Sequence, residues 1–191
     1  MKTKKICFII HSLHAGGMER VMSELVNYFA LRNIYEVHLI LYGVKREFFY
    51  EVPNSIIIHK PNFEFNIKSR FLSTLKTLFF VRQVIKKIAP ISVLSFGERW
   101  NNMVLLATLG AKIPVYVSDR AQPNKSIGKL HDYLRKKLYP TAAGVIVQTE
   151  KALTIFKKMY HHTNFKIIGN PIRQFSKQDI EKKNIILMVG R

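Results

Sequence analysis

At 191 residues, the chain has the length of one domain, or of one domain together with the start of a second. Its residues are 48% hydrophobic and 12% aromatic, which excludes a disordered protein, and no apolar run approaches the roughly 20 residues that span a bilayer. Lysine and arginine number 31 against 12 acidic residues, so the formal net charge is +19. A charge of this size indicates an anionic partner: nucleic acid, anionic lipid headgroups or a phosphorylated substrate.

The single cysteine indicates the compartment. Cys7 lies in the first apolar run and has no second cysteine with which to form a disulfide, so we expect a small core residue in a reducing environment. The same apolar run is too short for a signal peptide. The sequence therefore predicts a cytoplasmic protein.

The stretch from residue 5 to residue 21 carries the strongest local signal. Ile6–Ile10 is a short run rich in β-branched residues, typical of a strand buried on both faces, and apolar residues recur at helical spacing from Met18 onward. Between them, Gly16 and Gly17 place backbone N–H groups and a helix N-terminus where an anion is stabilised. The alternative is that the glycine pair only makes a tight turn, since the three-glycine dinucleotide fingerprint is absent.

Further apolar runs alternate with amphipathic stretches along the chain, and this alternation predicts an α/β fold with a Rossmann-like, doubly wound parallel sheet. We expect the strands 6–10, 91–96 and 144–148 to be central, because they are apolar on both faces. The other expected strands are 35–42, 55–59, 115–118 and 165–168, and the other expected helices are 66–89, 103–110, 126–139 and 150–160.

Polar residues gather after three of these strands. They occupy residues 11–19, 97–102 and 119–122, which we expect to be exit loops. In parallel sheets of this kind, ligands bind beyond the carboxyl ends of the strands. The three loops therefore predict one shared binding site.

The alternation stops at residues 170–171, an Asn-Pro pair. We expect one domain over residues 1–172, a polar linker over 173–183, and the first strand of a truncated second domain over 184–191.

With these motifs placed, the chain resembles the N-terminal half of a bacterial family-4 glycosyltransferase with the GT-B fold. The resemblance rests on four segments in the family's order, and the strand at 188–191 resembles the one that opens the family's second domain. The four segments are His-Ala-Gly-Gly-Met-Glu-Arg at 14–20, Val-Ser-Asp-Arg-Ala-Gln-Pro at 117–123, Val-Ile-Val-Gln-Thr-Glu at 145–150 and Ile-Ile-Gly-Asn-Pro-Ile at 167–172.

The resemblance implies two Rossmann-like domains that face a cleft, the N-terminal one for the acceptor and the C-terminal one for a nucleotide-sugar such as a UDP-sugar. It also implies transfer with retention of anomeric configuration, no cofactor and no essential metal. The implied acceptors are lipid-pyrophosphate-linked sugars or other envelope glycans. Because the donor-binding motif belongs to the second domain, we expect these 191 residues alone to be inactive.

The resemblance also suggests site residues. A departing nucleoside diphosphate develops negative charge, which the N–H groups of Gly16 and Gly17 are suited to stabilise, and Arg191 aligns with an arginine that binds the donor diphosphate in relatives. The expected acceptor-binding residues are His14, Glu19, Arg20, Glu98, Arg99, Asp119 and Arg120.

Three of these assignments keep an alternative. Many relatives carry a histidine beyond the strand corresponding to 115–118, where this chain has Asp119 and Arg120, so the residue that supports catalysis is unknown. Arg120 either contacts a phosphate or pairs with Asp119. Glu98 and Arg99 either bind the acceptor or belong to a solvated loop.

No metal site is expected at His161 and the following histidine, because adjacent residues do not share a helix face.

The charge leaves two non-catalytic alternatives, a nucleic-acid-binding protein and a membrane-surface module. The first is disfavoured because no nucleic-acid-binding motif is present. The second is favoured by the helix at 66–89, where lysines and arginines alternate with apolar residues, although a packed helix with a solvated outer face gives the same pattern. We expect a glycosyltransferase that is peripheral on the inner face of the cell membrane and does not bind nucleic acid.

Overall fold

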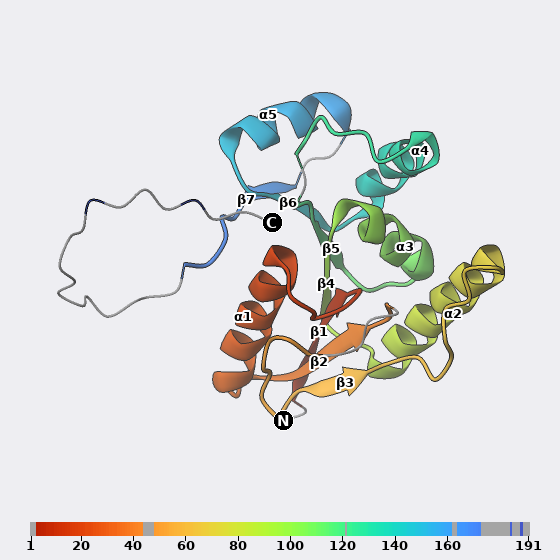
Figure 1. The fold of residues 1–191 in the computed structure, drawn as a ribbon, viewed down its shortest axis with the longest axis vertical. Coiled ribbons are helices and arrows are strands. Elements are labelled where there is room, and N and C mark those ends of the chain that lie inside the picture. The colour runs from red at the N-terminus through yellow and green to blue at the C-terminus, as the bar shows by residue number, and fades with distance from the viewer. Residues whose placement is uncertain are drawn as a thin grey trace.

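The computed structural model describes residues 3–43, 48–120, 122–161 and 164–172, together with Asn184 and Met188. At its centre is a seven-stranded sheet in the order β3-β2-β1-β4-β5-β6-β7, in which every neighbouring pair is parallel (Figure 1). The strands are β1 (Lys4–Ile10), β2 (Tyr35–Leu41), β3 (Ile57–His59), β4 (Ser92–Phe96), β5 (Val115–Ser118), β6 (Gly144–Val147) and β7 (Phe165–Ile167).

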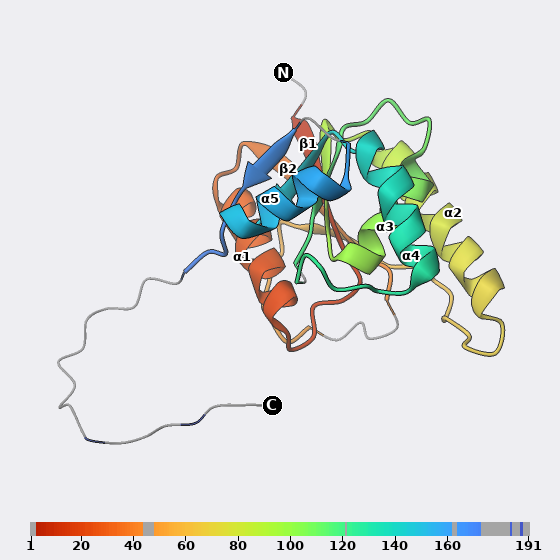
Figure 2. The same cartoon turned by 90° about the horizontal axis from the view of Figure 1, so that it is seen from above.

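Helices cover both faces of this sheet, as the sequence predicts. Helix α1 packs on one face, and α2, α3 and α4 lie side by side on the other (Figures 1 and 2). The helices are α1 (Gly17–Leu31), α2 (Arg70–Ile88), α3 (Glu98–Thr108), α4 (Lys129–Leu138) and α5 (Glu150–Met159), and a 3-10 turn, η1 (Tyr139–Thr141), follows α4. Within the described ranges, none of these helices is long and apolar enough to cross a membrane.

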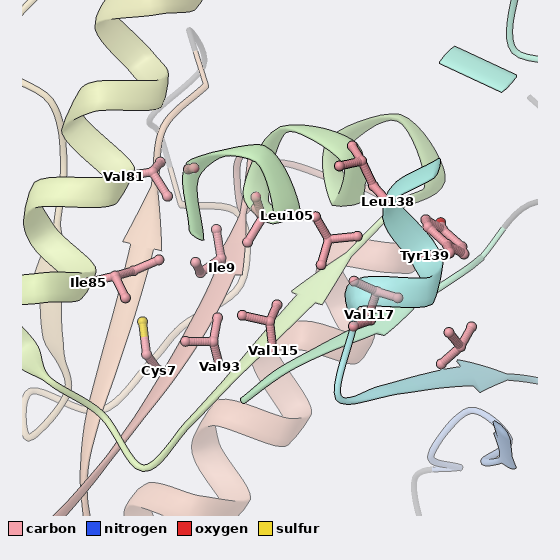
Figure 3. Packing of buried hydrophobic residues seen from close by; sticks show 14 of the residues in the cluster. Cys7, Ile9, Val81, Ile85, Val93, Leu105, Val115, Val117, Leu138 and Tyr139 are labelled. Carbon is pink, nitrogen blue, oxygen red and sulfur yellow. The ribbon is translucent and has the colours of Figure 1, made fainter. Parts of the chain in front are cut away.

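The alternation of side chains along β1 divides the core in two. Cys7 and Ile9 point to the face under α2 and α3, where Figure 3 shows them beside Val81 and Ile85. Ile6, Phe8 and Ile10 point to the face under α1. β1, β4 and β6 each have a strand on both sides, which confirms the prediction that they are central. Burial raises the pKa of the Cys7 thiol far above its usual range, so the thiol stays protonated.

The order of the chain reverses between β1 and β4. From β1 the chain proceeds to β2 and β3 on one side, and from β4 it proceeds to β5, β6 and β7 on the other. The N-termini of α1 and α3 follow these two neighbouring strands, at their carboxyl ends. This is the topological switch point at which open parallel sheets bind ligands.

Several predicted boundaries are wrong. The main correction concerns residues 98–102, predicted as an exit loop, which form the first turns of α3. The chain leaves β4 through Gly97 alone, whose φ of 96° makes the turn in one residue and lets Glu98 begin the helix. α2 begins at Arg70 rather than at residue 66, and α4 at Lys129 rather than at residue 126. The linker at 173–183 and the strand at 184–191 lie outside the described residues, apart from Asn184 and Met188, so these two expectations remain untested.

Candidate functional site

The loop after β1 is held in place by the segment that follows β2. The backbone N–H of Gly43 donates to the carbonyl of His11 at 2.7 Å, an approach so close that a Cβ on Gly43 would lie 2.3 Å from that oxygen. The N–H of Phe49 donates to the carbonyl of Leu13 at 3.0 Å. Tyr50 then donates its hydroxyl to the carbonyl of Gly16 at 2.9 Å. These bonds fix residues 11–16 before α1 begins.

The two glycines of this loop differ in their surroundings. A Cβ on Gly16 would lie 2.1 Å from a carboxylate oxygen of Glu19, so this position leaves room for Glu19 to fold back over the start of α1. A Cβ on Gly17 would meet no described atom within 4 Å, and Gly17 is exposed. Gly16 therefore accommodates a neighbour within the chain, whereas the side of Gly17 is open to a ligand.

Glu19 meets two histidines beneath this loop. Its Oε1 atom lies 3.5 Å from His11 Nε2 and 3.5 Å from His14 Nδ1, and its side chain is only 7% exposed. The His11 ring stacks on Trp100 of α3, with centroids 5.1 Å apart and an interplanar angle of 17°. Burial lowers the pKa of His11 below 6.5, although the Glu19 carboxylate opposes that shift. His11 is therefore mainly neutral at pH 7.

The start of α3 lies against the start of α1. A Cβ on Gly97 would lie 3.1 Å from Met18 Sδ, so the two helix N-termini approach closely at the switch point. Glu98, half-buried, and Arg99, exposed, stand on the first turn of α3 beside this contact. The positive charge of Arg99 also reaches His131 of α4, whose pKa is lowered by burial and then by Arg99. Arg99 thus lies close enough to α4 to act on the charge of His131.

Asp119, after β5, belongs to a buried network. Its Oδ2 atom accepts a hydrogen bond from Arg135 at 2.8 Å and another from the Tyr139 hydroxyl at 3.0 Å. The side chains of Asp119 and Arg135 are almost fully buried. Burial alone would lower the pKa of Arg135, but Asp119 together with Tyr139 and Tyr160 outweighs the effect of burial, and the pKa is raised. Asp119 was expected to bind the acceptor; in the structure its carboxylate is buried and bound to α4 and η1.

Arg120 takes the opposite position, at the rim of the site. Its guanidinium lies 4.2 Å from the centroid of the Phe96 ring and donates to the side-chain oxygen of Asn170, which also accepts a bond from Gln148 at 3.2 Å. Burial lowers the pKa of Arg120 from 12.5 to about 10, so it remains a cation at neutral pH. It borders a cavity of about 250 Å³ whose wall includes Gln148 and Thr149.

The expected acceptor and donor residues are thus only partly brought together. His14, Glu19, Gly16 and Gly17 form one group after β1, with Glu98 and Arg99 beside it on α3. Arg20 is half-buried in the first turn of α1, Arg120 lies over Phe96 after β5, and Arg191 lies outside the described residues.

Sequence reasoning missed Asn101, which links the two halves of the site. Its side-chain oxygen accepts from Ser95 at 2.8 Å, and its amide donates to the Ser118 carbonyl at 3.1 Å and the Tyr139 hydroxyl at 3.2 Å. It also missed Trp100 and Tyr50. The only sequence signal was the unusual Trp-Asn-Asn triplet at 100–102, because the partners of these residues are distant in the chain.

Comparison with known proteins agrees with this geometry. The model of Glycosyltransferase Family 4 matches residues 15–173. A curated relative from Campylobacter jejuni subsp. jejuni serotype O:2 (strain ATCC 700819 / NCTC 11168) is 27% identical over 194 residues, covering 98% of this chain and 52% of the relative. It is named GalNAc-alpha-(1->4)-GalNAc-alpha-(1->3)-diNAcBac-PP-undecaprenol alpha-1,4-N-acetyl-D-galactosaminyltransferase. The chain therefore spans about half the length of this relative.

Solved structures also match the fold of this chain. The lipopolysaccharide outer core galactosyltransferase WaaB matches with a TM-score of 0.69 at 17% identity, over 88% of this chain and 46% of that protein. Sucrose-phosphate synthase from Thermosynechococcus elongatus matches with a TM-score of 0.67 at 9% identity, over 87% of this chain and 48% of that protein. The fold is one half of a GT-B architecture, as expected from the motifs. With the family model covering most of its length, the chain belongs to glycosyltransferase family 4.

Proposed function

We propose that the chain is the acceptor-binding half of a retaining glycosyltransferase that transfers a sugar from a nucleotide-sugar to an envelope glycan or lipid-linked acceptor. The observation that carries the proposal is the switch point, where two helix N-termini, an exposed glycine and a rim arginine share one edge of the sheet. The name of the Campylobacter relative, which describes transfer to a glycan on a pyrophosphate-linked lipid, supports the acceptor class.

On the donor side, we assign the diphosphate to the start of α1. The N-terminus of a helix carries partial positive charge, and the open side of Gly17 allows a phosphate to approach the backbone. Such preformed N–H groups stabilise the charge that develops on a departing nucleoside diphosphate. Gly16 contributes its backbone to the turn, and Arg191 is proposed to bind the diphosphate from the other side of the cleft. The donor is proposed to be a UDP-sugar, with no cofactor and no metal required for the transfer.

On the acceptor side, we assign the anionic group to Arg120. A guanidinium braced on an aromatic ring and bonded to Asn170 is held in one orientation, as bidentate recognition of a phosphate requires. Glu98, Arg99 and His14 offer charged and hydrogen-bonding groups to sugar hydroxyls from the neighbouring loops. Asp119 is proposed to position Arg120 rather than to contact the acceptor, because its own carboxylate binds Arg135. Arg20, in the first turn of α1, is also proposed to bind the acceptor, whereas Glu19 folds back over the start of α1.

The outer face of α2 supports attachment to an anionic membrane. The buried side chains of α2 include Val81, Ile85 and Ile88, whereas Phe71, Leu72 and Phe79 are 75%, 58% and 63% exposed. The exposed residues that border these apolar side chains include Lys68, Arg70, Lys76, Lys86 and Lys87.

This basic, apolar surface continues toward the proposed site. Leu130 and Tyr133 of α4 are 68% and 59% exposed, and Arg70 and Arg99 both act on the charge of His131 between them. The N-terminal ends of α2, α3 and α4 thus meet on the side of the sheet's carboxyl edge. Attachment through this surface would bring the proposed acceptor site close to a lipid-linked substrate. Each basic residue near an anionic leaflet contributes about 1 kcal/mol.

Charge reversal tests the membrane surface. We expect a triple variant with glutamate in place of Lys76, Lys86 and Lys87 to be released from anionic vesicles. Its thermal stability should be nearly unchanged, because the three lysines are exposed. The matched control reverses Lys151, Lys157 and Lys158 of α5, which are equally exposed and give the same net charge. If both triple variants sediment alike, α2 is not the membrane surface. Binding to a DNA duplex, measured in parallel, should be weaker than binding to the vesicles.

The acceptor assignment has its own experiment. Nanodiscs with a polyprenyl-pyrophosphate-linked sugar should bind the chain more tightly than nanodiscs of the same lipids without it. Arg120→Gln should remove that difference, whereas Arg32→Gln should keep it, because Arg32 lies at the far end of α1. Equal binding to the two kinds of nanodisc would contradict the proposed acceptor.

A further inference from the structure

Three metal-ligating side chains converge where β1 meets α1. His11, His14 and Glu19 each offer one ligand atom, and these three atoms lie within 4.8 Å of one another. The residues are eight positions apart at most, and the loop that carries them is fixed by backbone bonds to Gly43 and Phe49. The cluster is thus built into the fold rather than formed by free surface side chains.

The distances from Glu19 Oε1 to the two imidazole nitrogens fit a shared metal ion better than hydrogen bonds. Glu19 Oε1 lies 3.5 Å from each imidazole nitrogen, beyond the 2.7–3.2 Å of ordinary N–H···O bonds. Zinc holds nitrogen and oxygen ligands at about 2.0–2.2 Å in a tetrahedron, which separates neighbouring ligands by roughly 3.3 Å. The two distances from Glu19 Oε1 need only a small contraction to match this value, and the two imidazole nitrogens lie within 4.8 Å of each other.

The burial of Glu19 also calls for a positive partner. Its side chain is 7% exposed, and a carboxylate taken out of water is costly unless a charge compensates it. The dipole of α1 supplies a part of that compensation, since Glu19 lies in the first helical turn. A divalent cation between the carboxylate and the two imidazoles would supply the rest.

We propose that His11 Nε2, His14 Nδ1 and Glu19 Oε1 bind one Zn²⁺ ion. Two imidazoles and a carboxylate are a ligand set that zinc accepts with one position left open. That position faces solvent through His14, whose side chain is 38% exposed, so water or a ligand oxygen completes the tetrahedron. Trp100 fixes the plane of the His11 ring from the other side.

Ser12 competes for the same nitrogen. Its Oγ atom lies 2.6 Å from His14 Nδ1, so zinc binding displaces this hydrogen bond and the hydroxyl turns away. Removing the hydroxyl should therefore leave zinc affinity unchanged or increase it. Ser12→Ala is the variant that tells metal ligation at Nδ1 from a hydrogen-bonded cluster.

Calorimetry on the metal-stripped 191-residue chain tests the proposal without donor or acceptor, so its outcome is independent of the proposed function. The parent should bind one Zn²⁺ per chain, and His14→Ala and Glu19→Gln should each weaken binding at least tenfold. His161→Ala, which removes an exposed histidine elsewhere, should leave zinc affinity unchanged. Ser12→Ala should leave zinc affinity unchanged or increase it. Zinc should also raise the melting temperature of the parent and not that of Glu19→Gln.

Two results would overturn the proposal. One is the absence of binding by the parent at micromolar zinc. The other is equal affinity for the parent and His14→Ala, which shows that the ion sits elsewhere. Because His14 is partly exposed, its removal should not unfold the chain, and circular dichroism of each variant checks this.

Discussion

Glycine and glutamate share one small space at the start of α1. The Glu19 carboxylate occupies the position that a Cβ of Gly16 would need, while Gly17 has open space around it. The two adjacent glycines of this motif are therefore needed for two different reasons. The first glycine is needed by the protein itself, and the second leaves room for a ligand.

Two alanine substitutions separate these requirements. Gly16→Ala should push the Glu19 carboxylate away from His11 and His14 and so weaken zinc binding at least tenfold, with a stability change within about 1 kcal/mol because a flexible side chain can move. Gly17→Ala should leave zinc binding and folding intact. Calorimetry and thermal unfolding of both variants make the comparison. Equal zinc affinity for Gly16→Ala and the parent would contradict the role of Gly16.

The ion pair of Asp119 and Arg135 predicts a large loss of stability on mutation. Asp119→Asn leaves the Arg135 guanidinium buried without its counter-charge, which should cost about 3–5 kcal/mol in the free energy of unfolding. Glu64→Gln, which removes an exposed acid, should change stability by less than about 0.5 kcal/mol. Urea denaturation measures both values. A loss near that of Glu64→Gln would mean that the pair does not stabilise the fold.

The site could be predicted from sequence only as far as its loops. The glycine pair, Arg120 and the polar ends of the strands are local signals, and the sheet brings them to one edge. The bonds that orient them join residues far apart in the chain, such as Tyr50 with Gly16 and Asn101 with Tyr139. No local pattern specifies such a pair.

At the scale of elements, the edge pair β2 and β3 carries a histidine cluster. His38 Nδ1 lies 3.0 Å from His59 Nε2, and His38 Nε2 lies 2.8 Å from Glu36 Oε1. Burial lowers the pKa of both histidines below 6.5. The folded chain thus disfavours the protonated form of these two histidines relative to the unfolded chain.

The sign of the pH dependence follows from this difference. Since the unfolded histidines take up protons at about pH 6.5, before the folded ones do, the free energy of unfolding should fall as pH decreases from 7.5 to 5.5. This window lies above the titration of ordinary carboxylates. The double variant His38→Gln with His59→Gln should lose less stability over the same range. Urea denaturation at several pH values tests this, and a constant stability of the parent would contradict it.

Helices α3 and α2 show where the prediction from sequence failed. The polar residues at 97–102 read as a loop because Asn101 and Asn102 are poor helix formers, yet their amides bond to other elements inside the fold. In α2, Arg82 is one of the basic residues that alternate with apolar ones, but its guanidinium donates to the carbonyls of Ala107 and Leu109 at the end of α3. Tertiary contacts decided both cases.

For the whole molecule, the sequence predicted the architecture well. Central strands such as β1 are apolar on both faces, and this property, together with regular alternation, specifies a covered parallel sheet. The family motifs occur at the carboxyl ends of the strands, so fold and site agree. The mode of transfer, the donor and the acceptor are properties of a complete two-domain cleft, and they remain proposals.

We propose above that the carboxyl edge of this sheet binds a lipid-linked acceptor. Amide chemical shifts of the 22.2 kDa chain, recorded while a short-chain polyprenyl-pyrophosphate-linked sugar is added, test it most directly. We expect shifts at residues 11–17, 97–100, 119–124 and 148–149, which follow β1, β4, β5 and β6. Shifts confined to the opposite edge, at residues 32–34, 89–91, 111–114 and 142–143, or no shifts at all, would contradict it.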